Sequence, residues 1–451
     1  MAEVRVGFAI RLANTARLAV AAWRERRVPF LPRAEIEKLQ RARLERTVRH
    51  AWRTVPYWRR AMEERGLVPS DIATAADLAR LPLLEERDVR LRLDELRSEE
   101  WRDRETAVLE SSASGRGSVP KCIPWDPDAA LMRLAHAERD RAVVLRLCGG
   151  GRGRRQLFIL PECSTSLRLR AWWDQRIALP PRFARREQLS PESSFEEMLE
   201  RLELLRPAII YSYGSVTERF FRFLEATATK TALPAVWVYG GDGMHREWRE
   251  WAERRGCRVY STYQAVEVGR IGFECERREG FHLNVDLCPV RILDREGNDV
   301  AAGEPGEVVV SNLVNRATVL LNARIGDRAV LSPEPCPCGR SLPLLVSLEG
   351  RVWEMVQLGD GRELTTTSLQ NIFAESLHFS VQHQIVYPGP GRVEWRVVPL
   401  PGADVETAVR RMEARAREML GPETRFRVEI VGEIRATAGG KAPPMGVLPV
   451  S

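Results

Sequence analysis

Residues 195–226 read FEEMLERLELLRPAIIYSYGSVTERFFRFLEA, and this stretch decides the fold class of the chain. Apolar residues recur at helical spacing through Phe195–Leu205, which predicts an amphipathic helix. The run Ala208–Tyr213 predicts a strand, and Val216–Ala226 predicts the next helix. A strand between two helices indicates a parallel sheet whose faces are covered by helices.

The same alternation continues on both sides of this stretch. Further strands are predicted at Gln156–Leu160, Ala235–Tyr239 and Arg258–Tyr263, with a helix at Met244–Arg255. Ligands of such sheets bind at the carboxyl ends of the strands. The candidate binding loops are therefore Ser111–Gly117, Gly240–Gly243 and Tyr263–Glu267.

A chain of 451 residues is too long for one compact core, so two or more domains are expected. The sequence becomes β-rich from residue 289, and a unit of about a hundred residues begins after Gly350-Arg351. The elements predicted in this unit are a hairpin around Asp360-Gly361, strands at Gln384–Tyr387, Val393–Val398 and Arg425–Val431, and helices at Leu369–Ser376 and Val405–Leu420. We expect an α/β protein with a large N-terminal domain over residues 1–349, made of parallel sheet and a β-rich subdomain, and a small α+β domain over residues 350–451.

The composition is that of a soluble globular protein, with 44% hydrophobic and 29% charged residues. No apolar run approaches the roughly 20 residues of a membrane span, and three arginines break the stretch Val4–Trp23, unlike a signal peptide. The net charge of +7 comes from interleaved acidic and basic residues, without the basic stripe that would indicate nucleic acid. We therefore expect a cytoplasmic protein with neither a membrane nor a nucleic-acid partner.

Lysine is rare in this chain, and one lysine follows two glycines close to the C-terminus. Only Lys38, Lys121, Lys230 and Lys441 are lysines among the 69 basic residues. Lys441 ends the segment RATAGGK that begins at Arg435. A compact ammonium on a flexible stem suits a loop that inserts one charge between a phosphate and a carboxylate. The alternative is an ordinary solvated lysine.

Three further positions carry groups suited to a nucleotide. The loop Ser111–Ser118 offers hydroxyls, backbone N–H groups and glycines for a phosphate cradle, although it lacks the P-loop pattern. Glu267 could hold Mg²⁺, and Asp327 could accept hydrogen bonds from ribose hydroxyls. The alternatives are an ordinary loop, a solvated or capping glutamate and a turn aspartate.

Four side chains form a candidate metal site. Cys275 and His282 precede the Cys336-Pro-Cys338 knuckle, and three thiolates with one imidazole match a closed, structural zinc site. The alternative is unpaired cysteines in a reducing compartment. The remaining histidines show no Ser/His/Asp or HExxH arrangement, so the sequence does not predict a hydrolase.

Taken in order, these motifs resemble the adenylate-forming (ANL) superfamily, in the branch of phenylacetate–coenzyme A ligases and related coenzyme-adenylating and capsular-polysaccharide-type proteins. The resemblance covers most of the chain and rests on the order and spacing of several short motifs. These motifs are Thr54-Val-Pro-Tyr-Trp58, Leu81-Pro-Leu-Leu84, Tyr263…Glu267, Glu274-Cys275…His282, Gly303–Val310, Ile325-Gly-Asp327, Cys336-Pro-Cys-Gly-Arg340, Gly350-Arg351 and Gly439-Gly-Lys441.

The resemblance implies that ATP and a carboxylic acid react at the α-phosphorus to give an acyl-adenylate and pyrophosphate. A small mobile C-terminal domain then rotates for transfer of the acyl group, usually to coenzyme A, and a homodimer is common in the branch. By this resemblance Glu267 binds Mg²⁺ and Lys441 stabilises charge on the α-phosphate and the attacking carboxylate. The ATP-binding residues that it implies are Ser111, Ser112, Ser114 and Gly115 at the phosphates, Gly241, Asp242, Tyr263 and Gln264 near adenine, and Asp327 and Arg351 at the ribose.

The chain departs from the pattern of this family at several positions. Ala113 stands where a glycine is usual, and Asn322 and Ala323 stand where arginine and tyrosine are expected. Three functions therefore stay open: an acid–coenzyme A ligase, an adenylate-forming biosynthetic enzyme that transfers to an amine or another nucleophile, and a nucleotide-binding protein without catalysis.

Overall fold

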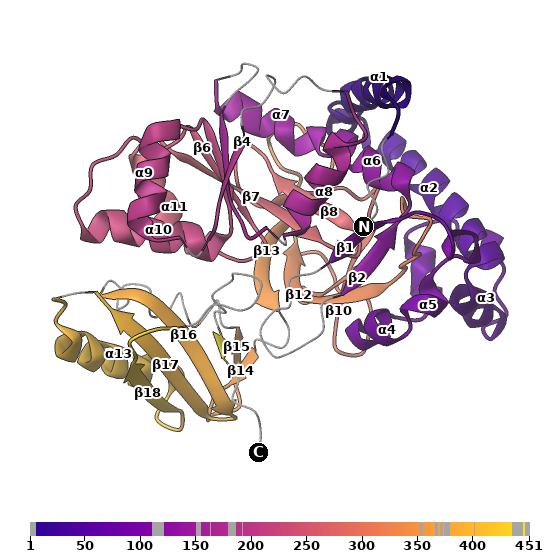
Figure 1. Ribbon diagram of the computed structural model, residues 1–451. Coiled ribbons are helices and arrows are strands. Elements are labelled where there is room, and N and C mark those ends of the chain that lie inside the picture. The colour runs from indigo at the N-terminus through magenta and orange to yellow at the C-terminus, as the bar shows by residue number, and fades with distance from the viewer. Residues whose placement is uncertain are drawn as a thin grey trace.

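The computed structural model describes residues 6–110, 121–149, 155–162, 164–178, 186–191, 193–351, 355–365, 369, 373, 379–400, 402–434 and 445–446. Within these ranges a large body of helices around a twisted sheet is followed by a small sheet with one long helix, drawn in yellow in Figure 1. No helix in this part of the chain is long and apolar enough to cross a membrane.

The large sheet of the described residues has eleven strands in the order β10-β11-β12-β13-β9-β8-β7-β6-β5-β3-β4. The parallel half consists of β3 (Gln156–Ile159), β4 (Arg186–Leu189), β5 (Ile209–Ser212), β6 (Val236–Gly240) and β7 (Arg258–Ala265). The antiparallel half consists of β8 (Gly269–Glu274), β9 (Phe281–Leu283), β10 (Val290–Leu293), β11 (Pro305–Val310), β12 (Ala323–Leu331) and β13 (Leu344–Arg351). The parallel and β-rich parts predicted from the sequence are thus halves of one mixed sheet, joined at the β7–β8 turn.

The ends of the first helix within residues 195–226 are determined by neighbouring residues. In α9 (Phe195–Leu205) the Ser194 hydroxyl accepts a hydrogen bond from the backbone N–H of Glu197 at 3.1 Å, which caps the first turn. The helix buries Met198, Leu202 and Leu205 on one face. It ends at Arg206, which is left-handed with φ 43° and precedes Pro207, a residue that cannot continue a helix.

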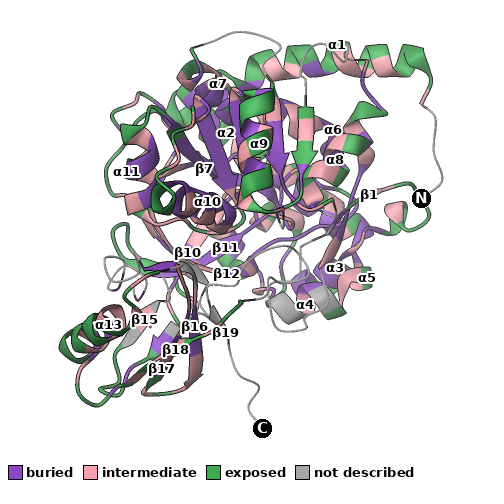
Figure 2. Ribbon diagram, turned by 60° about the vertical axis from the view of Figure 1, so that its left-hand side comes forward, coloured by how far each residue is buried: buried purple, intermediate pink, exposed green. Residues whose placement is uncertain are grey.

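Apart from the edge strand β4, in which only Leu189 is buried, the strands of the parallel half are largely buried between two layers of helices (Figure 2). Successive side chains of β6 point to opposite faces: Trp237 packs with α9, α10 (Gly214–Ala226) and α11 (Arg246–Arg254), whereas Val236 and Val238 pack with α2 and α7. The remaining elements before β3 are α1 (Phe8–Glu25), α2 (Arg33–Thr54), α3 (Pro56–Glu63), α4 (Glu86–Leu91), α5 (Leu93–Leu96), β1 (Ala107–Glu110), β2 (Cys122–Trp125), α6 (Pro127–His136) and α7 (Glu138–Leu147), and α8 (Thr165–Asp174) follows β3.

The C-terminal elements form a separate small sheet in the order β18-β17-β16-β19. Its core includes Phe373, Trp395 and Met412, the last from α13. The elements are the hairpin β14 (Met355–Gln357) and β15 (Glu363–Thr365), then β16 (Ser380–Gly389), β17 (Arg392–Pro399), α13 (Val405–Leu420), β18 (Arg425–Ile430) and β19 (Met445–Gly446). The division of the chain at residue 349 stays a prediction.

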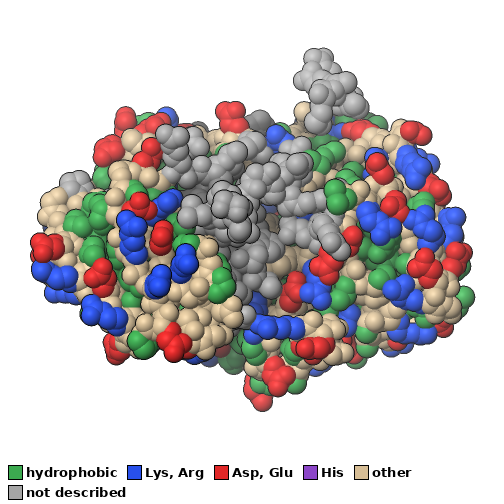
Figure 3. All heavy atoms as spheres, turned by 90° about the horizontal axis from the view of Figure 1, so that it is seen from below, with side chains coloured by type: hydrophobic (Ala, Val, Ile, Leu, Met, Phe, Trp, Pro, Cys, Tyr) green, Lys and Arg blue, Asp and Glu red, His purple; other side chains and the backbone are tan. Residues whose placement is uncertain are grey.

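The small sheet touches the large body through β16. The rings of His383 on β16 and His245 before α11 lie 5.8 Å apart, and His245 Nδ1 lies 2.7 Å from Glu218 Oε2 on α10. On the face shown in Figure 3 the described cationic and anionic side chains are interspersed over both parts of the molecule. The described contact between α10 and β16 therefore contains titratable groups.

Candidate active site

The loops that follow β5 and β6 are tied together by Asp242. Its Oδ1 atom accepts hydrogen bonds from the backbone N–H of Gly214 at 2.5 Å and of Ser215 at 3.2 Å, and its Oδ2 atom accepts one from Ser215 Oγ at 2.5 Å. A carboxylate at this position satisfies the free N–H groups and the positive end of α10. A Cβ atom on Gly214 would lie 2.3 Å from the carbonyl oxygen of Gly243, so the contact requires glycine.

Tyr263 and Asp327 meet although they come from opposite halves of the sheet. The buried Tyr263 hydroxyl donates a hydrogen bond of 2.7 Å to Asp327 Oδ2. Burial and the neighbouring Asp327 carboxylate raise the pKa of Tyr263 well above its usual value of 10, so the hydroxyl is a donor at neutral pH. Arg351 lies opposite Asp327 in the register of β12 and β13. Three residues that the resemblance assigns to adenosine are therefore neighbours.

Glu267 occupies the tight turn between β7 and β8, where Ala265 pairs with Gly269. Its side chain is buried and forms an ion pair with Lys121 Nζ, which is also mostly buried. Its backbone carbonyl accepts a hydrogen bond of 2.8 Å from Asn312 Nδ2. The turn therefore presents one anchored, charge-compensated carboxylate, a hard oxygen donor of the type that Mg²⁺ prefers.

The structure describes only some of the remaining predicted site residues. Ser111, Ser112, Ser114, Gly115 and Lys441 lie outside the described residues, and their predicted roles stay predictions. Gln264 is exposed at the end of β7, and Gly241 has the left-handed φ of 84° that favours glycine.

Lys121 was missed as a site residue when the sequence was read alone. It is one of four lysines in the chain and directly follows the serine- and glycine-rich loop. The scarcity that singles out Lys441 therefore applies equally to Lys121. Only the fold reveals its partner, because 146 residues separate Lys121 from Glu267.

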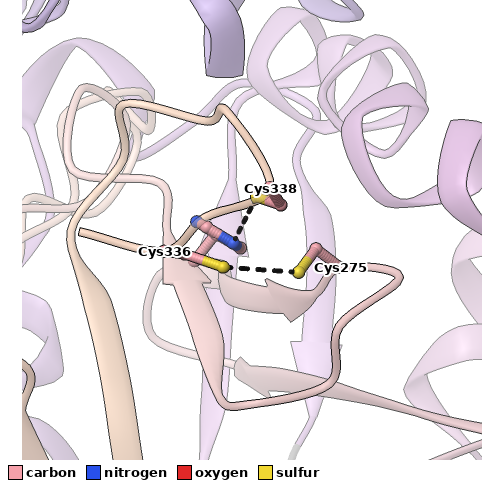
Figure 4. Close-up of side chains that lie close together, drawn as sticks. Cys275, Cys336 and Cys338 are labelled. Atoms are coloured by element: carbon pink, nitrogen blue, oxygen red, sulfur yellow. Dashed lines mark hydrogen bonds between the residues drawn. The ribbon is translucent and has the colours of Figure 1, made fainter.

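The four candidate metal ligands do converge. Cys275 follows β8, His282 lies in β9, and Cys336 and Cys338 lie between β12 and β13, with all potential ligand atoms within 4.8 Å of one another. The Cys275 and Cys336 sulfurs are 3.8 Å apart, and Cys338 Sγ lies 3.3 Å from His282 Nε2 (Figure 4). Thiolates held about 2.3 Å from a tetrahedral ion would stand about 3.8 Å apart, so the donor set and its spacing fit zinc.

Surrounding residues hold this cluster in place. The guanidinium of buried Arg340 donates a hydrogen bond of 2.8 Å to Glu276, which connects the Cys336–Arg340 knuckle to the residue after Cys275. Burial and the nearby Arg340 charge lower the pKa of His282 to about 4, so its imidazole is neutral near pH 7. A neutral imidazole has the lone pair that a metal requires.

Comparisons with known proteins extend over most of the chain. The chain is 23% identical over 351 residues to a phenylacetate–coenzyme A ligase of Thermus thermophilus, and the match covers 72% of each chain. It is 23% identical over 404 residues to the phenylacetate–coenzyme A ligase of Aromatoleum evansii, covering 85% of this chain and 86% of the relative. The crystal structure of 2-hydroxyisobutyryl-CoA ligase with R3-HIB-AMP matches with a TM-score of 0.75 and 19% identity, covering 94% of this chain and 92% of that one. No family model matches the chain.

Proposed function

We infer that this chain, which has the fold of the adenylate-forming (ANL) superfamily and distant sequence similarity to phenylacetate–coenzyme A ligases, is an ATP-dependent ligase that activates a carboxylic acid as its acyl-adenylate and passes the acyl group to coenzyme A. The hydrogen bond between Tyr263 and Asp327 carries this inference. It brings two motif residues together at the carboxyl end of β7, where sheets of this kind bind their ligands.

The proposed reaction has two steps. In the first, a carboxylate oxygen of the acid bonds to the α-phosphorus of ATP while the bond from that phosphorus to the bridging oxygen breaks, which releases pyrophosphate. In the second, the thiolate sulfur of coenzyme A attacks the acyl carbonyl carbon and AMP leaves. Asp327 and Arg351 would orient the ribose, and Tyr263 would hold Asp327 in position. Lys441 would offset the negative charge at the reacting oxygens.

Glu267 fits the role of a magnesium ligand, because its carboxylate is buried and already paired with a cation. Glu267 would hold Mg²⁺, whose positive charge would offset the negative charge of the phosphates. Lys121, the residue directly after the serine-rich loop, would keep this carboxylate charge-compensated when no metal is bound.

The Cys275, His282, Cys336 and Cys338 cluster is proposed to hold a structural zinc ion. Four protein ligands leave no open position for a substrate or water, so the ion would stabilise the fold and take no part in the chemistry. It would fix the segment after β12 to the β8–β9 hairpin.

ATP–pyrophosphate exchange with a panel of aryl and aliphatic acids tests the first step. Wild-type exchange should depend on the acid and fall roughly 100-fold or more in Lys441→Ala, whereas Lys230→Ala, at an exposed lysine, should match wild type. Absence of exchange with every acid, combined with retained ATP binding, would indicate a non-catalytic nucleotide-binding protein. Mass spectrometry of products with and without coenzyme A tests the second step, since an acyl-amine formed without coenzyme A would replace the proposed acceptor.

A further inference from the structure

Among the described residues no carboxylate pairs with Arg133 on α6, although its side chain is largely enclosed. Its Nη1 atom is buried and no described residue accepts a hydrogen bond from it. The guanidinium carbon lies 4.5 Å from the ring centroid of Trp125, and it lies 3.1 Å from the point where a Cβ atom of Gly269 would stand. Glycine at position 269, with φ of 81°, therefore leaves the space that this guanidinium occupies.

Two neighbouring arginines, by contrast, are paired with carboxylates. Arg139 on α7 donates to both carboxylate oxygens of Asp286, at 2.7 and 2.9 Å, and to Glu25 at 2.7 Å. Arg270 pairs with Asp140. Arg133 has no equivalent among the described residues, and burial together with the charge of Arg270 lowers its pKa to about 9. A largely buried charge without a partner is costly, which favours an anionic group that the described residues do not supply.

The position of Arg133 connects it with the candidate active site. Gly269, against which the guanidinium packs, closes the same turn that carries Glu267, two residues earlier. The Cα atoms of these two residues can be at most about 7 Å apart. Trp125, on the other side of the guanidinium, donates from Nε1 to the carbonyl of Val266 in this turn at 3.4 Å. Arg133 therefore lies beside the turn that carries Glu267, where the far end of an acid bound at that turn could contact it.

We propose that Arg133 binds a second anionic group at the far end of the acid substrate, so that the preferred substrates are dicarboxylic acids and the residue determines their selection. The proposal rests on the ligase function proposed above. A planar guanidinium can donate two parallel hydrogen bonds to a carboxylate, and its contact with the Trp125 ring restricts its position. Binding of an anionic ligand also gives the Arg133 guanidinium a partner, which adds to the preference for such a ligand.

Matched ligand pairs test this selection. Each linear or aromatic dicarboxylic acid is compared with its monoamide, which has nearly the same shape but one charge fewer. In pyrophosphate exchange, the wild type should favour the diacid at least tenfold for the best pair, and Arg133→Gln should lose most of that preference. An unchanged preference in Arg133→Gln, or a wild-type preference for the monoamide across the panel, would overturn the proposal.

Calorimetric binding of the same pairs to the full chain separates this proposal from the ligase function. Diacid binding that weakens at least tenfold in Arg133→Gln, without exchange by any acid, would support the role of Arg133 while removing the ligase function. Exchange with monocarboxylic acids alone, and no calorimetric binding of any diacid, would support the ligase function and overturn the role of Arg133.

A structural role for Arg133 makes a different prediction. If Arg133 awaits a ligand, Arg133→Met should unfold at a temperature equal to or above that of the ligand-free wild type, because an unpaired charge is removed. Arg139→Met is the matched control and should unfold at a lower temperature, because it removes the fully buried cation that pairs with both Asp286 and Glu25 and leaves Arg43 as their shared arginine partner. A comparable loss in both variants would show that Arg133 serves the fold and would overturn the proposal.

Discussion

The hydroxyl of Tyr263 donates a hydrogen bond of 2.7 Å to Oδ2 of Asp327, which joins the last parallel strand, β7, to β12 in the antiparallel half of the sheet. Because 64 residues separate them, this bond exists only once the mixed sheet has assembled. It also sets the direction of the carboxylate that is proposed to meet ribose. Folding of the sheet and preparation of the nucleotide site are thus coupled at one contact.

Tyr263→Phe removes the donor and with it one restraint on the Asp327 carboxylate. We expect a loss of about 1 kcal/mol in the free energy of unfolding and a higher KM for ATP in pyrophosphate exchange. Tyr57→Phe is the matched control, in the N-terminal helices and outside the nucleotide loops. The position of Asp327 would not depend on Tyr263 if the two variants had the same KM for ATP.

The same variant should alter the stability of the protein at alkaline pH. The pKa of Tyr263 is raised in the folded state, so the folded chain keeps a proton that the unfolded chain releases near pH 10. The stability contributed by this group is therefore complete below about pH 10 and falls as the pH rises further. Urea unfolding should show wild type losing stability relative to Tyr263→Phe above pH 10, and parallel curves would contradict this assignment.

Lys121→Met strands the buried carboxylate of Glu267. Breaking a buried ion pair from one side costs about 3–5 kcal/mol, so the variant should be clearly less stable without ligand. Mg²⁺ with ATP should restore more stability to this variant than to wild type, because the metal replaces the lost cation. Thermal unfolding with and without Mg²⁺ and ATP measures both effects.

Adding Glu267→Gln to the Lys121→Met variant gives the double variant of a double-mutant cycle. The double variant should recover much of the lost stability, since the stranded charge is gone, but it should not recover exchange activity. Lys230→Met controls for the loss of an exposed lysine. Equal stability of Lys121→Met and wild type would show that the ion pair contributes nothing.

Local patterns were sufficient to predict the amphipathic helices. The structure places α9 and α13 at the predicted residues, Phe195–Leu205 and Val405–Leu420, since each has apolar residues at helical spacing and a capping side chain before it, Ser194 or Asp404. The continuity of the mixed sheet could not be predicted in this way. It depends on pairing between distant strands, such as His282 with Leu344, which leaves no periodic signal in either segment.

The residues of the candidate site also differ in whether the sequence alone could identify them. The four metal ligands could be found from the sequence because thiols and imidazoles are chemically distinctive and two of them share a knuckle. Lys121 and Arg133 could not, because their importance lies in what surrounds them: a buried acid in one case and the lack of any described acid in the other. The roles of Ser111, Gly115 and Lys441 rest on the residue chemistry and the resemblance, and they stay predictions because these residues lie outside the described part of the chain.

Removal of the proposed zinc should loosen the β8–β9 hairpin and the knuckle that contacts it. We expect about one zinc ion per chain in wild type, little in Cys336→Ser, and a lower unfolding temperature after treatment with a strong chelator. Cys257→Ser, a buried cysteine outside the cluster, should retain the metal. Wild-type protein without zinc and insensitive to the chelator would contradict the site.

His383 makes the contact between the small sheet and the large body sensitive to acid. Its ring lies near His245 and the Trp395 ring, and burial, the charge of Arg222 and His245 lower its pKa to about 3. The unfolded chain takes up a proton on this histidine near pH 6.5, whereas the folded chain does so only near pH 3. Stability from this group is therefore present above pH 6.5 and is lost as the pH falls towards 3.

His383→Gln stays neutral at every pH and should escape that loss. Between pH 6.5 and 5 the difference amounts to about 2 kcal/mol, at about 1.4 kcal/mol per pH unit. Urea unfolding of both proteins at pH 7.5 and pH 5 measures it, and the buried His136 and His282 contribute equally to both and cancel. If stability depended on pH in the same way in wild type and variant, His383 would be accessible to water, and packing of β16 against α10 would not lower its pKa.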